Sequence, residues 1–195
     1  GLNNAIGASS ACAMIPGGTD NVAAGNFSLA AGRRAKANHA GAFVWADSTD
    51  ADIASSTANQ FTARAAGGVR FFSNSGATAG VSLAAGGTSW GVISDRNAKK
   101  NFMPVDAKSV LKALAKVPIE KWNYRWESDE SVRHIGPMAQ DFKAAFYPGR
   151  DDKTITTLEF DGVALAAIKG LNEIVEDQRA ELERKQTEIA ELKVR

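Results

Sequence analysis

Cysteine, proline and histidine are scarce in this sequence of 195 residues, which has one cysteine (Cys12), five prolines and two histidines. A single cysteine excludes an internal disulfide, a CxxC redox pair and a cysteine-based zinc site. No apolar run reaches the roughly 18 residues needed to cross a bilayer. The start, Gly1-Leu2, shows neither an initiator methionine nor a signal-peptide pattern, so we expect the chain to be a piece of a longer protein.

Positive and negative charges nearly balance, because the sequence has 23 Lys and Arg residues and 22 Asp and Glu residues, which gives a net charge of +1. This balance gives no electrostatic reason to expect nucleic acid or an anionic membrane as a partner. Arg33, Arg34 and Lys36 form a basic cluster that we interpret as a solvated turn, with glycan or phosphate binding as the alternative. His39 has no companion ligands nearby, so we expect neither a metal nor a cofactor.

The region before Ser94 is rich in small residues and shows no helical apolar period. Instead, short segments alternate with period two, as strands do, at residues 27–32, 43–48 and 81–86. The first two begin at Phe27 and Phe43, and small residues alternate between them. This repeat predicts a β-rich, β-solenoid-like and intertwined region, whose coils bury small side chains and stack on their neighbours.

Residues 21–32, which read Asn-Val-Ala-Ala-Gly-Asn-Phe-Ser-Leu-Ala-Ala-Gly, resemble the head repeats of trimeric autotransporter adhesins. The resemblance extends over about residues 18–50 and implies a left-handed β-roll. After it, residues 60–65 and 68–73 are strand candidates, and we predict that Ala66-Gly67 joins them in a hairpin. Narrow β segments bury too little apolar surface to offset backbone ordering, which favours association of several chains.

The residues after 103 predict an α+β region. Residues 107–117 carry apolar side chains at helical spacing, with Asp106 as N-cap and Pro118 as the stop. Residues 119–126 predict a strand with Trp122, Tyr124 and Trp126 on one face. Residues 133–142 pass through a Gly-Pro turn into a short helix that ends near residues 146–149. Residues 154–160 predict a further strand, closed by Asp161-Gly162.

From Val163 to the end, the sequence predicts one long coiled-coil helix. Its polar core positions at Gln178 and Lys185 lower stability and are typical of layers that set register or oligomer number. A single helix that packs against its own domain is the alternative. With Ile168 as position a, the a positions are Ile168, Val175, Leu182 and Ile189, and the d positions are Leu171, Gln178, Lys185 and Leu192.

Ser94 and Lys99 stand at the junction between these two regions. A Ser-Lys pair can cleave a peptide bond when the lysine is neutral and accepts the seryl proton, which burial and positive neighbours favour. Residues five apart lie on different faces of a helix or a strand. The two side chains can therefore meet only across a loop or between neighbouring chains, and on the spacing alone a polar linker is the favoured interpretation.

Several motifs then occur in a fixed order: residues 94–99 (Ser-Asp-Arg-Asn-Ala-Lys), Asn101, residues 134–141 (His-Ile-Gly-Pro-Met-Ala-Gln-Asp) and residues 165–168 (Leu-Ala-Ala-Ile). Together they resemble the peptidase S74 domain, the C-terminal intramolecular chaperone of phage tailspikes and endosialidases. The resemblance implies a domain that trimerises a fibre, directs its folding and cuts itself off before the serine.

Carried over, the resemblance makes Ser94 the nucleophile, Lys99 the base and Ile93–Ser94 the scissile bond. Lys100 and Phe102 depart from the family, which usually has an acidic residue and an aliphatic residue there. A rival triad of Ser94, His134 and Asp141 lacks the Gly-x-Ser-x-Gly turn of a hydrolase nucleophile.

We therefore expect a β-rich stalk segment (residues 1–93), a chaperone and autoprotease core (94–162) and a coiled-coil helix (163–195). The expected function is a chaperone that trimerises a fibre, tailspike or adhesin and releases itself by Ser-Lys autoproteolysis. A trimerisation and display module that does not cut is the alternative. We expect a homotrimer on a virion or a bacterial surface, with no nucleic acid, membrane or cofactor, and a cell-surface glycan as a possible partner of an upstream part.

Overall fold

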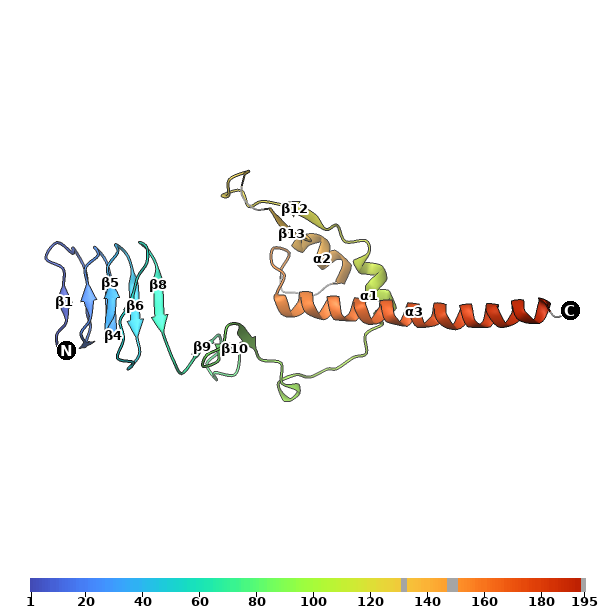
Figure 1. Cartoon of the computed structure of the whole chain (residues 1–195), viewed down its shortest axis with the longest axis horizontal. Coiled ribbons are helices and arrows are strands. Elements are labelled where there is room, and N and C mark those ends of the chain that lie inside the picture. Colours follow the sequence, from blue (N-terminus) through green and yellow to red (C-terminus); the bar gives the residue numbers. More distant parts are fainter. Residues whose placement is uncertain (131–132, 147–150, 194–195) are drawn as a thin grey trace. The chain divides into compact units, whose positions relative to one another are not determined.

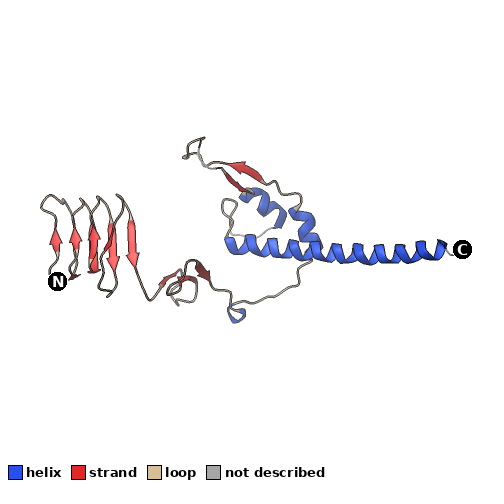
Figure 2. Ribbon diagram, viewed as in Figure 1, coloured by secondary structure: helices blue, strands red, loops and turns tan. Residues whose placement is uncertain are grey.

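The computed structural model describes residues 1–130, 133–146 and 151–193. The chain divides into two compact units, Gly1–Asp95 and Arg96–Arg195. Strands make up the regular structure of the first unit and helices dominate the second (Figure 2). Among the described residues, no helix is apolar enough over a sufficient length to cross a membrane.

The first unit opens with a β-solenoid, as predicted. Its strands stack side by side in two parallel sheets, ordered β1-β3-β5-β7 and β2-β4-β6-β8 (Figure 1). The strands are β1 (Ala5–Ile6), β2 (Gly18–Thr19), β3 (Val22–Ala23), β4 (Leu29–Arg33), β5 (Ala35–Ala37), β6 (Phe43–Ala46), β7 (Ile53–Ala54) and β8 (Phe61–Arg64).

The register of the solenoid differs from the predicted repeat, which ran from Phe27 to Phe43. Leu29, not Phe27, pairs with Phe43. Phe43 then pairs with Phe61, and this coil is longer than the one before it because the loop after β6 is longer. Phe27 falls outside β4 because it adopts a left-handed backbone conformation (φ 57°) at the turn before the strand.

Small side chains fill the interior of the solenoid. The buried cluster holds alanines and one larger residue, Val44, because the two sheets enclose only a narrow space. Large apolar side chains instead point outward, where the Phe43 and Phe61 rings stack with centroids 4.8 Å apart. The buried cluster consists of Ala23, Ala30, Ala35, Ala37, Ala42, Val44 and Ala46.

Asparagine side chains join successive coils. Asn21 is fully buried, and its amide donates to the carbonyl of Gly32 (2.8 Å) while its oxygen accepts from the backbone of Ala35 (2.9 Å). Asn4 repeats this arrangement one coil earlier, with bonds to Gly18 (2.9 Å) and to the Asn21 backbone (3.0 Å). Buried polar groups are costly unless bonded, so these side chains fix the stacking of the coils.

Asp47 and Arg64 close the last coil. Their side chains form an ion pair of 2.9 Å, and the Asp47 carboxylate also accepts from the backbone of Ala66 at 2.7 Å. Arg64 donates further to the carbonyls of Thr49 (3.0 Å) and Ala51 (2.7 Å). The Ala66 amide and the Arg64 guanidinium hold the pKa of the Asp47 carboxyl well below its usual range. This network ties the loop after β6 to the end of β8.

The predicted hairpin of residues 60–73 is wrong. Strand β8 adds to the parallel ladder through β6, where Phe61 stacks on Phe43, and the segment that follows pairs with a later strand instead. The antiparallel sheet lies one strand later and has the order β11-β10-β9. Its strands are β9 (Val69–Phe72), β10 (Gly80–Leu83) and β11 (Trp90–Val92).

The second unit begins with a short 3-10 helix, η1 (Arg96–Ala98), followed by α1 (Ala107–Leu114). Asp106 caps α1 as predicted, because its carboxylate accepts from the backbone N–H of Ser109 at 3.2 Å. The helix ends shortly before Pro118, close to the predicted stop.

The predicted strand at residues 119–126 is shorter in the structure. Only β12 (Glu120–Trp122) forms, paired antiparallel with β13 (His134–Gly136). The three aromatic residues still gather, since Tyr124 packs edge-on against Trp122 and stacks on Trp126. Helix α2 (Ala139–Phe146) follows the Gly-Pro turn, and the rest of its predicted end, residues 147–149, lies outside the described residues.

Helix α3 (Thr157–Lys193) begins earlier than predicted, so the expected strand at residues 154–160 is wrong. Thr156 and Glu159 form a reciprocal cap: Thr156 Oγ1 accepts from the Glu159 backbone (3.3 Å), and the Glu159 carboxylate accepts from the Thr156 hydroxyl (2.9 Å). A Thr-x-x-Glu pair of this kind starts a helix. It outweighs the strand preference of the threonines and isoleucine before it.

One face of α3 packs on α1. Ala167 and Gly170 are buried there, and a side chain at Gly170 would place its Cβ 2.2 Å from the Ala107 carbonyl. Lys108 and Asp177 form an ion pair across the two helices. The apolar residues at heptad positions outside this contact are exposed, with exposed fractions of 51–64% for Ile168, Leu171, Leu182, Ile189 and Leu192.

Candidate processing site

The predicted scissile bond follows a strand. β11 ends at Val92, and Ile93 comes next with 45% of its surface exposed. Ser94 and Asp95 follow in an exposed loop at the end of the first unit. The bond before Ser94 is therefore anchored on its N-terminal side by a hydrogen-bonded strand, and its C-terminal side lies outside any strand or helix.

Lys99 follows η1 at the start of the second unit. Its backbone N–H donates to the Arg96 carbonyl at 3.1 Å, which closes the short helix. The Arg96 guanidinium lies 5.3 Å from the centre of the Phe102 ring, a distance at which a cation is attracted to the ring face. Arg96 and Lys100 therefore place positive charge within a few residues of Lys99, while all of them are exposed in this chain.

Ser94 belongs to the first unit and Lys99 to the second. Each is placed within its own unit, so their pairing as a catalytic dyad stays a prediction. Both residues are exposed at the surface of their units, which leaves them accessible to groups from other parts of the chain or from a neighbouring chain.

The rival triad fails on the position of its histidine. His134 Nε2 lies 3.0 Å from Glu127 Oε1, and its ring stacks on Trp122 with centroids 4.7 Å apart. The hydrogen bond from His134, together with the Tyr124 backbone, lowers the pKa of Glu127. The acidic partner of His134 is thus Glu127 and not Asp141, which the triad requires.

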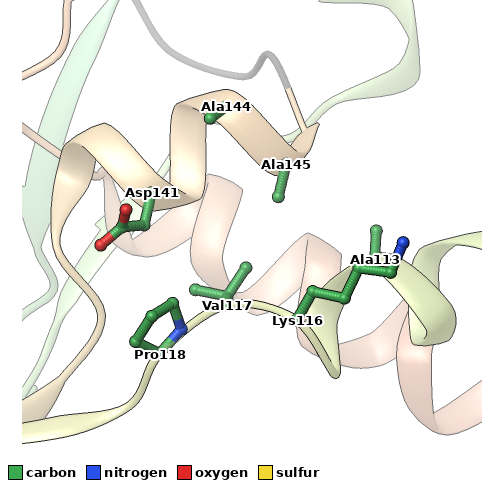
Figure 3. Close-up of a pocket in the computed structure, with 7 residues that line it drawn as sticks. All are labelled: Ala113, Lys116, Val117, Pro118, Asp141, Ala144 and Ala145. Atoms are coloured by element: carbon green, nitrogen blue, oxygen red, sulfur yellow. The ribbon is translucent and has the colours of Figure 1, made fainter.

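Asp141 instead borders a shallow hollow of about 410 Å³ between α1 and α2. Figure 3 shows Asp141 on α2 and Val117 and Pro118 on the segment that follows α1. Apart from Asp141 and Lys116, the hollow is lined by alanine, valine and proline. This set offers no nucleophile beside the carboxylate, so the hollow gives no support for hydrolysis.

The basic cluster of the solenoid is paired with acidic residues. Arg33 binds Asp50 at 2.9 Å, and Arg34 binds Asp52 at 2.7 Å. His39 Nδ1 lies 2.8 Å from the Ser55 hydroxyl. Within the described ranges, no group of three or more His, Cys, Asp or Glu side chains is arranged to hold a metal. These contacts agree with a structural interpretation of the cluster as a turn between coils.

Comparison with protein families gives one match, at residues 94–149, to the family described as "chaperone of endosialidase", Peptidase_S74. The chain carries a peptidase S74 domain. The match begins at Ser94, and the segment it covers contains η1, α1, β12, β13 and α2. Comparisons with curated proteins and with solved structures give no match.

Inside the peptidase S74 domain, Glu127 is the partner of His134, and the sequence did not predict this contact. Its contact with His134 depends on the antiparallel pairing of β12 and β13, which sets Trp122 opposite His134. The backbone N–H of Tyr124 also donates to the Glu127 carboxylate at 2.8 Å. No sequence period links residues 127 and 134, because Glu127 lies outside the two paired strands.

Proposed function

We propose that residues 94–193 form an intramolecular chaperone that assembles three copies of the chain and then releases itself by cutting the Ile93–Ser94 bond. The observation that carries this proposal is the family match, whose first residue is Ser94 itself. The proposal divides the chain into a β-rich product (1–93), a chaperone core (94–162) and an assembly helix (163–195). The product would be part of a fibre, tailspike or adhesin on a virion or a bacterial surface.

In the proposed reaction, Ser94 Oγ attacks the carbonyl carbon of Ile93 and transfers its proton to a neutral Lys99. The Ile93–Ser94 carbon–nitrogen bond breaks, and the amide nitrogen of Ser94 leaves as an amine after taking that proton. The Ile93 acyl group is then held as an ester on Oγ. Water hydrolyses the ester, which gives the Ile93 carboxylate and restores the Ser94 hydroxyl.

Assembly would control this reaction through the environment of the lysine. A lysine is neutral near pH 7 only when burial and nearby positive charge disfavour its charged form. Arg96 and Lys100 supply positive charge beside Lys99, but Lys99 is exposed in the single chain. The burial must therefore come from neighbouring parts of an assembled protein, so cutting would report that folding is complete.

The exposed heptad positions of α3 support association through this helix. Leu182, Ile189 and Leu192 are more than half exposed, and a stripe of such residues every 3.5 positions is buried when helices supercoil. Lys185, one of the polar d positions, forms an ion pair of 2.7 Å with Glu181 along the helix, so its charge has a partner beside the seam. A glycan receptor would be bound by an upstream part of the protein.

The test is a denaturing gel and intact-mass measurement of freshly purified protein. The wild-type chain of 20.6 kDa should yield two fragments, the second beginning Ser-Asp-Arg. Ser94→Ala and Lys99→Ala should each abolish cutting, a loss of at least a thousandfold in rate. Lys112→Ala, which removes the same charge from an exposed position on α1, should retain it. A full-length wild-type band that persists for days would refute the cutting.

A trimerisation and display module that does not cut is the second candidate. It is favoured by the exposure of both Ser94 and Lys99 in the single chain. Light scattering separates assembly from cutting, because Ser94→Ala should keep a mass of three chains under either candidate. The mass of a single chain for that variant would refute both.

A further inference from the structure

The sheet of β9, β10 and β11 has a hollow on the face that carries Arg70. In the antiparallel register, Ser82 pairs with Arg70 on one side and with Gly91 on the other, so these three residues share a face. Residues two positions apart along a strand lie on the same face, which adds one further residue from each strand segment. The face therefore consists of Arg70, Phe72, Gly80, Ser82, Gly91 and Ile93.

Two glycines leave room for this hollow. A Cβ on Gly80 would lie 1.9 Å from the Phe71 carbonyl oxygen, so the centre of the face cannot carry a side chain. Gly91 leaves the neighbouring position on β11 open as well. The hollow has a volume of about 260 Å³, and both Arg70 and Ile93 line it. It lies entirely within the first unit.

Arg70 differs from the arginines of the solenoid. Each of those three forms an ion pair with an aspartate at 2.7–2.9 Å: Arg33, Arg34 and Arg64. Among the described residues, Arg70 has no carboxylate partner, and its guanidinium lies 4.6 Å from the centre of the Phe72 ring. A guanidinium that stacks on a ring keeps its N–H donors for another group. Arg70 is therefore a cation with unused donors in the hollow that Ile93 also lines.

We propose that Arg70 binds the carboxylate that cutting creates at Ile93. The inference rests on the proposed function, in which hydrolysis of the ester leaves Ile93 as a chain end. Before cutting, the Ile93 carbonyl belongs to a neutral peptide bond, and afterwards it carries a negative charge on two oxygens. A guanidinium matches such a group with two parallel hydrogen bonds. The ligand is thus the C-terminal carboxylate of the same chain.

The geometry of the sheet permits this contact. One strand separates β9 from β11, so their backbones lie roughly 10 Å apart. The long side chain of Arg70 can cross most of this distance above Gly80, which has no side chain in the way. Ile93 follows the last pair of the ladder, Val81 with Val92. Once cut, this chain end can therefore turn toward the guanidinium without breaking the ladder.

Binding of the carboxylate would hold the last strand of the product in place. β11 is an edge strand, joined to the sheet by three residue pairs with β10. Chain ends fray unless they are tied down, and cutting turns the end of β11 into such an end. A bound carboxylate also stays away from the departing amine of Ser94. The reaction would thus create the group that secures the strand next to the cut.

The test measures hydrogen exchange of residues 90–93 by mass spectrometry, in the full chain before and after cutting. In wild-type protein that has cut itself, we expect these amides to exchange about tenfold more slowly than in the cut Arg70→Gln protein. In the Ser94→Ala chain, which does not cut, Arg70→Gln should change their exchange by less than about twofold. The difference arises because only the cut chain carries a carboxylate at Ile93.

Two further variants serve as controls. Arg33→Gln removes an arginine that is already paired with Asp50 in the solenoid, and it should leave the exchange of residues 90–93 unchanged. Arg70→Lys keeps the charge but not the forked donor, so its cut form should exchange at a rate between those of wild type and Arg70→Gln. If Arg70→Gln does not fold, Arg70→Lys provides the same comparison of cut and uncut chains.

Four outcomes contradict the inference. Equal effects of Arg70→Gln in cut and uncut chains show that Arg70 only supports the sheet through Phe72. No effect in either chain refutes any role in holding β11. Slower cutting by Arg70→Gln places the action of Arg70 before the bond breaks, when no carboxylate exists. A wild-type chain that does not cut refutes the proposed reaction, and the inference falls with it, whereas the first three outcomes leave that reaction standing.

Discussion

The solenoid and the helical unit use their apolar residues in opposite ways. In the solenoid, hydrogen bonds between neighbouring strands and from the Asn4 and Asn21 side chains join the coils. The buried core consists almost only of alanines. In the helical unit, α3 buries little more than Ala167 and Gly170 and leaves its long aliphatic side chains exposed. The stacking of coils thus depends on close backbone approach, whereas the long helix depends on other helices.

The largest expected effect tests the close approach in the solenoid. Gly32 has φ 95°, and a Cβ there would lie 1.7 Å from the Ala46 carbonyl oxygen. Gly32→Ala should destabilise the solenoid by roughly 2–5 kcal/mol, from backbone strain and overpacking together. Hydrogen exchange by mass spectrometry should show protection lost from residues 18–65 but kept in α1 and α3.

Gly17→Ala is the control for this substitution, because a Cβ at Gly17 has nothing within 4 Å. It should leave the exchange of the solenoid unchanged. Similar protection in the two variants would mean that the coils are less tightly stacked than the contacts of Gly32 indicate.

The next effect tests the dependence of the helical unit on association. Leu182 is 58% exposed at an a position, and Leu182→Lys in the Ser94→Ala chain should weaken association at least tenfold by burying a charge in the helix seam. Light scattering across a dilution series should show the mass falling toward that of one chain, 20.6 kDa. Thr187→Lys adds the same charge at an outer f position and should keep the assembled mass.

The smallest effect concerns the polar closure of the solenoid. The pKa of the Asp47 carboxyl is lowered on folding by the Ala66 amide and Arg64, so its stabilisation is present above its unfolded pKa of about 3.9 and is lost as the pH falls toward the lower folded pKa. Thermal unfolding should show the wild-type solenoid losing stability in acid below about pH 4.

Asp47→Asn should lower the melting temperature of the solenoid at pH 7 and reduce its acid dependence. Asp50→Asn is the control, because Asp50 is 61% exposed in its pairs with Arg33 and Arg34 and surface pairs contribute little. Equal melting temperatures for the two variants at pH 7 would contradict a special role for Asp47.

Local structure was predictable from the sequence where a residue acts on its immediate neighbours. Asp106 and Pro118 indicated the limits of α1 because capping and proline chemistry operate within one turn. The Thr156 and Glu159 cap belongs to the same class and was missed, since the isoleucine and threonines beside it favoured a strand. The identity of the peptidase S74 domain was also predictable, because its motifs are short and ordered.

Strand pairing and side-chain contacts between residues far apart in the sequence were less predictable. Residues 60–65 have strand character whichever strand they pair with, and the structure pairs them with β6, where Phe61 stacks on Phe43. The contact of His134 with Glu127 likewise depends on the β12–β13 register. For the Ser94 and Lys99 pair, the sequence predicts the chemistry but not the approach of two side chains that belong to different units.

The turns of the solenoid bear on how its length could change by duplication of a coil. Residues of four unrelated types take the left-handed conformation at matching places in successive coils: Cys12, Phe27, Gly41 and Asn59, with φ between 57° and 68°. The position therefore constrains the backbone more than the side chain. Duplication of one coil would therefore lengthen the solenoid by one strand spacing of roughly 4.8 Å and leave its end coils unchanged.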